Sequence, residues 1–277
     1  MASSSIQASE VEKKSTTDHP DWLELPRDVT ANILKRLDTV EIVTSACLVC
    51  PLWWNICNDS EFWGSIRMTK LRYSSYDYED NLIQICLYAI DLSCGQLEEI
   101  NIDYFATDDI LALISNRYMR LIDCGALSDI AFCESVMRLQ HLEELEISFN
   151  NGLSKYDSLE LVGRGCRLLK SLKYTGVVVD NKGNDVLFSI AKSMPGLHRL
   201  KISGDMPTDD GVVSVLDGCT LLESFDLRGC CTIHFSESLE KRCRHQIKDF
   251  GPPLQLSCAS NWDFGISSYV DSYFNMD

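Results

Sequence analysis

From residue 97 onward the chain repeats one short pattern, in which apolar residues occupy the first, fourth and sixth positions. An apolar residue at every second position is typical of a strand that buries one face. Copies begin at Leu97, Leu142, Leu169, Leu197 and Leu222, and a weaker copy, with Met119, Leu121 and Cys124, begins at Asn116. From Asn116 onward the starts lie 25 to 28 residues apart, a period typical of repeats that contain one strand, whereas the first interval is only 19 residues.

Each copy is followed by a polar residue and then by an amphipathic stretch. A side-chain oxygen at that point can accept hydrogen bonds from the free N–H groups of a helix's first turn. These polar residues are Thr107, Ser128, Ser158, Asn184 and Thr208. One strand and one helix per unit predict an α/β fold, a right-handed solenoid with a parallel sheet on its concave side. We expect residues 80–96 to form its first helix and residues 236–247 a capping helix.

The first part of the chain has a different apolar pattern, with a period close to that of a helix. Val29, Ile33 and Leu37 recur every four residues after Pro26, which suits the first turn of a helix. Thr39 can cap a second helix, and Pro51 can begin a third. Three helices this short bury little surface alone, so their remaining apolar side chains indicate a partner site.

These helical residues carry a resemblance to a known family. Leu25-Pro26, Ile33-Leu34 with Leu37, Val49-Cys50 with Trp53, and Phe62-Trp63 follow one another in the order of an F-box over residues 22–66. Pro51 and Trp54 stand where such motifs usually carry basic residues. With its short cysteine-containing leucine-rich repeats, the whole chain resembles plant F-box/LRR-repeat proteins. The simpler alternative for the first part is an ordinary helical subdomain packed on the rest of the chain.

The resemblance implies a partner, a function and a set of contact residues. The partner is a Skp-type adaptor and, through it, a cullin, so the chain is expected to be the substrate-receptor subunit of a Skp–cullin–F-box ubiquitin ligase. The alternative is a non-degradative LRR scaffold that also binds the adaptor. The expected adaptor-binding residues are Leu25, Pro26, Ile33, Leu34, Leu37, Val49 and Trp53.

Four parts of the chain follow from these patterns. We expect a disordered polar tail over residues 1–20, the F-box over 21–68, repeats with flanking cap helices over 69–248, and an acidic aromatic tail over 249–277. The last tail is rich in Trp, Tyr and Phe and has no Lys or Arg. Disorder is the simpler interpretation of that tail, and folding back over the end of the solenoid is the other.

Composition and charge exclude several classes of partner. The net charge is −16 and the pI is about 4.7, which disfavours nucleic acid as a partner. No stretch approaches 18 consecutive apolar residues, and Met1–His19 does not read as a signal peptide. We therefore expect no membrane contact, reduced thiols, and a location in the nucleus or the cytoplasm.

The thirteen cysteines follow the register of the repeats. Cys94, Cys166 and Cys219 each precede a leading leucine by three residues, which predicts small buried side chains where the helices end. Cys124 and Cys230 occupy the position at which such repeats use Asn or Cys to bind neighbouring backbone, whereas Phe105, Val177 and Asp205 depart from that pattern.

Catalytic and metal chemistry find little support. Cys47 and Cys50 have the spacing of zinc ligands, but no second pair stands at a usual distance along the chain. None of the five histidines has a recognisable relation to a cysteine nucleophile, which disfavours a cysteine-dependent hydrolase. We therefore expect no catalytic residue, no metal and no cofactor.

The predicted concave face has its own charge pattern. The fifth position of each copy forms a column across the sheet, consisting of Asn101, Arg120, Glu146, Lys173, Lys201 and Asp226. Lys173, Arg199 and Lys201 form a basic block, which predicts a client with an acidic stretch. The other interpretation is a solvated face whose charges pair across strands, as Glu146 could with Arg120 and Lys173. The candidate client-binding residues are Arg120, Glu146, Lys173, Arg199, Lys201 and Arg228.

Overall fold

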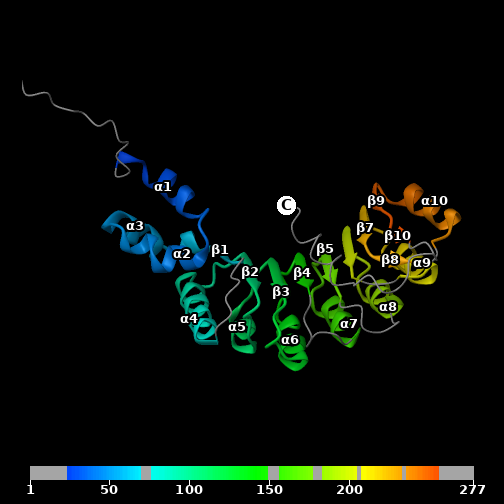
Figure 1. The fold of residues 1–277 in the computed structure, drawn as a ribbon, viewed down its shortest axis with the longest axis horizontal. Coiled ribbons are helices and arrows are strands. Elements are labelled where there is room, and N and C mark those ends of the chain that lie inside the picture. Colours follow the sequence, from blue (N-terminus) through cyan, green and yellow to red (C-terminus); the bar gives the residue numbers. More distant parts are fainter. Residues whose placement is uncertain are drawn as a thin grey trace, which may run out of the picture.

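Eight parallel strands form one curved sheet, and their order in the sheet is their order in the chain (Figure 1). The computed structural model describes residues 24–69, 76–148, 156–176, 183–204, 207–232 and 235–255. The strands are β1 (Ser65–Met68), β2 (Glu99–Asp103), β3 (Tyr118–Ile122), β4 (Glu144–Ser148), β5 (Ser171–Thr175), β6 (Arg199–Ser203), β7 (Ser224–Gly229) and β9 (Asp249–Gly251). Helices line the outer side of the curve, so the predicted solenoid is confirmed.

Helices alternate with these strands along the chain. They are α4 (Tyr76–Leu92), α5 (Asp108–Leu113), α6 (Asp129–Val136), α7 (Tyr156–Gly165), α8 (Gly183–Ser193), α9 (Asp209–Gly218) and α10 (Glu237–Gln246). Two short strands, β8 (Cys231–Thr232) and β10 (Leu254–Gln255), pair in parallel beside them. Strands β9 and β10 lie beyond residue 248, where we expected the repeats to end. The rest of the predicted tail lies outside the described residues, as does the predicted tail over residues 1–20.

The N-terminal segment is helical, as expected, and is joined directly to the sheet. It contains α1 (Arg27–Leu34), α2 (Thr39–Thr44), the 3-10 turn η2 (Ala46–Leu48), α3 (Pro51–Cys57) and the 3-10 turn η3 (Ser60–Trp63). Strand β1 follows at once and pairs with β2. The helical segment therefore runs directly into the first strand of the sheet that the repeats continue.

Hydrogen bonds of Asp38 and Thr39 connect the helical segment to the sheet, and they correct the predicted cap of the second helix. The carboxylate of Asp38, and not the hydroxyl of Thr39, caps α2 by accepting a hydrogen bond from the N–H of Val40 at 3.0 Å. Thr39 is buried, and its hydroxyl accepts from the N–H of Arg67 in β1. Asp38 also accepts from the N–H of Thr69. Both side chains thus connect α2 to the first strand of the sheet.

The polar residues before the repeat helices form lateral contacts as well as caps. Thr107 and Ser128 accept hydrogen bonds from the first turns of α5 and α6, as predicted. Ser158 and Asn184 instead lie inside α7 and α8, which begin earlier than expected. The amide of Asn184 donates to the hydroxyl of Thr208 at 2.7 Å, which links the starts of two neighbouring repeats.

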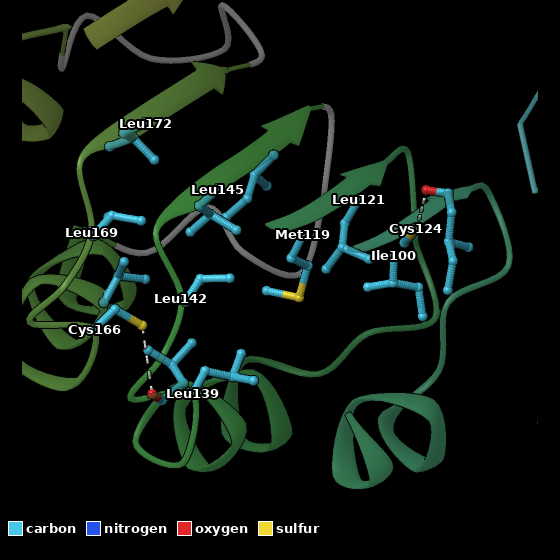
Figure 2. Packing of buried hydrophobic residues seen from close by; sticks show 14 of the residues in the cluster. Ile100, Met119, Leu121, Cys124, Leu139, Leu142, Leu145, Cys166, Leu169 and Leu172 are labelled. Carbon is cyan, nitrogen blue, oxygen red and sulfur yellow. Dashed lines mark hydrogen bonds between the residues drawn. The ribbon is translucent and has the colours of Figure 1, made fainter. Parts of the chain in front are cut away.

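The leading leucines and the inward strand positions form one continuous core. Figure 2 shows Leu142, Leu145, Leu169 and Leu172 pointing into the space between the strands and the helices, and all four are buried. In the weaker second copy, the buried Asn116 replaces the leading leucine. Its amide donates to the backbone oxygen of Tyr118, while its Oδ1 has no partner among the described residues. This polar substitution marks the weakest copy of the pattern.

Close approach of neighbouring helix ends requires glycine at residue 218. A Cβ atom at Gly218 would lie 2.4 Å from the carbonyl oxygen of Ala191, closer than packed atoms can come. We expect Gly218→Ala to lower the free energy of unfolding by about 1–3 kcal/mol because α8 and α9 must separate. Urea denaturation measures this change. Gly196→Ala is the matched control because its Cβ would meet open space, and an equal loss in both variants would contradict the steric explanation.

Candidate functional site

The N-terminal helices expose large apolar side chains that the core does not use. We call Val29, Leu48, Val49 and Trp54 the N-terminal apolar patch; Leu48, Val49 and Trp54 are 72%, 61% and 48% exposed. They lie on α1, on η2 and the residue after it, and on α3, elements that pack on one another. Exposed apolar residues gathered on one small segment indicate a protein interface.

The seven predicted adaptor contacts divide between this surface and the core. Pro26 and Val49 are exposed, and Leu25 and Ile33 are half-buried. Leu34 is fully buried, so in this chain it packs in the core and not on the surface. The remaining two, Leu37 and Trp53, are partly buried and pack against the core. Pro26 lies at the N-cap of α1, one position before the first turn where we expected it.

Sequence reasoning missed Val29, Leu48 and Trp54 as surface residues. Val29 recurs with Ile33 and Leu37 at helical spacing, which does not by itself show which of the three is exposed, and the structure leaves Val29 exposed. Leu48 belongs to a 3-10 turn, whose period differs from that of an α-helix, so helical spacing does not indicate which way it faces. Trp54 departs from the family pattern in the sequence, but that departure does not indicate that its side chain is exposed.

The predicted column on the concave face is confirmed by the register of the strands. Asn101, Arg120, Glu146, Lys173, Lys201 and Asp226 are successive partners, and the column extends to Arg67 in β1 and Gly251 in β9. A β-bulge interrupts the register after Lys201, so that Ser203 pairs with Gly229. Arg228 is the seventh residue of its copy, and it therefore does not pair with Ser203, the seventh residue of the preceding copy.

Carboxylates accompany every cation of the predicted basic block. Glu146 lies 2.8 Å from the ammonium group of Lys173 and 3.6 Å from the guanidinium of Arg120, as the pairing interpretation expected. Arg199 in β6 pairs with Glu144 in β4 at 2.7 Å, across the intervening strand β5. Lys201 lies 3.8 Å from Asp226. Asp226 also binds Arg228, 2.9 Å away. The block is thus a set of paired charges, most of whose cations remain partly exposed.

Tyr118 and Asp226 on this face have shifted pKa values. Burial, and then the charge of Glu146, raises the pKa of Tyr118 to about 12. Burial opposes the ionisation of Asp226, but the hydrogen bonds from Arg228 and the charges of Arg228 and Lys201 together outweigh it, so the pKa of Asp226 lies below its ordinary value. Tyr118 is therefore a neutral hydrogen-bond donor and Asp226 a carboxylate at neutral pH.

Two shallow depressions lie along the edge where the strands begin. The first is lined by Glu99, Arg117, Tyr118, Glu143 and Glu144. The second is lined by Lys170, His198, Arg199, Glu223, Ser224, Lys248 and Asp249. Within the described ranges, no three His, Cys, Asp or Glu side chains come together as metal ligands. No described helix is long and apolar enough to cross a membrane.

The repeat cysteines confirm most of the predicted register. Cys166 and Cys219 are buried, and their thiols lie 3.7 Å and 3.4 Å from backbone oxygens of the preceding repeat (Figure 2 shows the first contact). Cys124 and Cys230 approach the preceding strand's backbone in the same way. The prediction for Cys94 is wrong because α4 ends at Leu92, and Cys94 is exposed with φ of 48°.

These positions predict a difference in thiol reactivity. We expect native Cys94 to react with iodoacetamide at least about tenfold faster than Cys166 or Cys219, since only a reachable thiolate is alkylated. Burial raises the pKa of Cys166 to about 12 and that of Cys219 to about 11. Peptide mapping by mass spectrometry measures the three rates. Equal rates in the folded protein would contradict these positions, and equal rates in denaturant serve as the control.

Comparisons with known proteins agree with both parts of the structure. A model of the F-box domain matches residues 22–65. F-box protein SKIP19 of Arabidopsis thaliana is 37% identical over 278 residues, which cover 99% of this chain and 89% of that protein. Two Arabidopsis proteins described as F-box/LRR-repeat proteins are 36% and 34% identical over 84% and 91% of this chain, and over 53% and 82% of their own lengths. Among solved structures, the Rad7 and Elc1 complex of yeast aligns with 63% of this chain and 42% of that chain, at 17% identity and a TM-score of 0.38.

Proposed function

We propose, because this chain belongs to the F-box/LRR-repeat family, that it is the substrate-receptor subunit of a Skp–cullin–F-box ubiquitin ligase. The F-box binds the Skp-type adaptor and, through the adaptor, the cullin. The repeats hold a protein client in the nucleus or the cytoplasm. The chain brings the client close to a separate conjugating enzyme and orients it, and contributes no catalytic group or cofactor of its own.

The observation that carries this proposal is the N-terminal apolar patch, which lies within the residues that match the F-box model. Interfaces that bind a permanent partner contain apolar anchors surrounded by polar residues. Two charged residues of the same segment, Arg27 and Asp59, form an ion pair at 2.8 Å between α1 and the start of η3. This contact supports the helices that display the patch.

Direct continuity between the F-box and the sheet supports the second half of the proposal. Because β1 pairs with β2, a client on the concave face is held in a fixed orientation relative to the adaptor. Solenoids present extended concave surfaces for binding. The candidate client contacts on this face are Arg120, Glu146, Lys173, Arg199, Lys201 and Arg228.

Affinity purification of the tagged full-length chain tests the proposal, with a neddylation inhibitor present to retain the client. We expect the adaptor and the cullin to co-purify, and a co-purified client to accumulate when the chain is depleted. Adaptor binding without any change in client turnover would favour the non-degradative scaffold. Absence of the adaptor would contradict both functions.

A further inference from the structure

The concave sheet, together with the edge at which its strands begin, is divided into two halves of opposite charge. Strands β2–β4, each counted with the residue directly before it, contain six carboxylates and only two guanidinium groups. These residues are Glu98, Glu99, Asp103, Glu143, Glu144 and Glu146, against Arg117 and Arg120. Since these strands pair with one another, this half forms one acidic region, which is separated from the F-box helices by β1 and its Arg67.

The same count gives the opposite sign for β5–β7 and β9. Six cations there stand against three carboxylates, although the whole chain carries a net charge of −16. They are Lys170, Lys173, Arg199, Lys201, Arg228 and Lys248, against Glu223, Asp226 and Asp249. A basic half in a strongly acidic protein has a local potential that differs from the molecular average, and so selects partners by charge.

Three ion pairs cross the boundary between the halves, and their cations remain exposed to a partner. They join Glu143 with Lys170, Glu146 with Lys173, and Glu144 with Arg199, all within 2.8 Å. The three cationic side chains are 43% to 57% exposed. Exposed pairs of this kind contribute little to stability, so these cations can contact a client's carboxylates without a large loss.

Each half also contains one of the two depressions. The first is lined by Glu99, Tyr118 and Glu144 on adjacent strands, with Arg117 and Glu143 beside them. Carboxylates on both sides of a phenol ring suit a lysine or arginine side chain, which gains ionic and cation–π contacts there. The second is lined by the cations Lys170, Arg199 and Lys248 together with the carboxylates Glu223 and Asp249. Glu223 pairs with Lys248 at 3.2 Å, and the excess of cations suits a carboxylate or a phosphate.

The distance between the depressions sets a spacing for the ligand. The first is centred near β3 and the second near β6 and β7, three to four strands further along the sheet. Parallel strands lie about 4.8 Å apart, so the centres are about 17 Å apart, and an extended chain spans that distance in about five residues.

We propose that the concave sheet, along the edge where its strands begin, binds an extended client segment in which a basic residue and an acidic residue lie about five positions apart. The basic residue occupies the depression of β2–β4, and the acidic residue occupies the depression of β5–β9. This inference rests on the proposed function, and it identifies the chemical class of the client segment. It also extends the expectation of an acidic client, since the acidic stretch alone meets only half of the surface.

Synthetic peptides test the inference on the full-length chain. The first peptide contains Lys-Lys and Glu-Glu separated by three Gly/Ser residues, and its isomer has the same residues with Lys and Glu alternating. Peptides with four Lys or four Glu complete the set. We expect the first peptide to bind at least about fivefold more tightly than any other in fluorescence anisotropy, with a preference that weakens at high salt. Equal binding of the isomer, or of the four-Glu peptide, would overturn the proposal.

Charge reversals identify the surface. Glu99→Lys in the first depression and Lys248→Glu in the second should each abolish the preference for the first peptide. The matched controls are Glu134→Lys on α6 and Lys241→Glu on α10, which change charge by the same amount on exposed helical residues and should leave it unchanged. A preference that survives both depression variants, or is lost in the controls, would overturn the site. Adaptor co-purification, measured on the same proteins, reports separately on the proposed function.

Discussion

Replacing Leu48 and Val49 with alanine is expected to lower the affinity for the Skp-type adaptor at least about a hundredfold, or about 2.7 kcal/mol. Both side chains are mostly exposed on the residues that match the F-box model, and neither belongs to the core cluster of the described residues. Truncation of exposed apolar anchors removes interface contacts while changing stability by only about 0.5 kcal/mol. Surface plasmon resonance with the purified adaptor measures the change.

Leu221→Ala is the matched control for this double variant. Leu221 is also a large exposed apolar residue, but it lies between α9 and β7, far along the chain from the F-box. The control should bind the adaptor like the unmodified chain. If the double variant keeps its affinity, or if the control loses affinity equally, the N-terminal apolar patch is not the adaptor site.

Trp63→Ala is expected to lower the free energy of unfolding of the whole chain by about 3–5 kcal/mol. The indole is 1% exposed, and its N–H donates a hydrogen bond to the backbone oxygen of Cys57 at 2.7 Å. Its ring meets Phe62 edge to face, with centroids 5.4 Å apart. Because β1 begins two residues later and pairs with β2, the helices and the repeats should unfold in one transition.

Trp54→Ala is the matched control because it removes the same side chain from an exposed position of the same segment. We expect it to weaken adaptor binding and to change stability little. Denaturation followed by circular dichroism and by tryptophan fluorescence measures both variants. A loss below about 1 kcal/mol in Trp63→Ala, or two separate transitions, would contradict a single folded unit of F-box and repeats.

The charge column shows how far repeat spacing can predict a surface. The column from Asn101 to Asp226 follows from the repeated pattern itself. Alternate residues of a strand face one side of the sheet, and equal positions in successive copies become neighbours. The spacing could not locate the bulge after Lys201, which displaces Arg228 from its row. A bulge depends on how two strands pair with each other, and the sequence of one strand does not determine that pairing.

The cysteines show the same division. The burial of Cys166 and Cys219 is predicted by their shared position three residues before a leading leucine. Each directly follows a helix of the same length, α7 or α9. Cys94 shares that position, but α4 ends two residues before it, and the buried polar position there is Ser93. One helix that ends early is enough to expose the residue that the period would bury.

By itself the sequence determined the F-box helices, the repeat architecture, the inward leucines and the order of charges along the concave face. These features depend on periodicity, which is a property of neighbouring residues in one strand or helix. Only the tertiary structure decided that Leu34 is core and Leu48 is surface, that β1 joins the F-box to the sheet, and that Glu144 pairs with Arg199. Each of these depends on atoms from segments far apart in the chain, whose distances are set when the segments pack together.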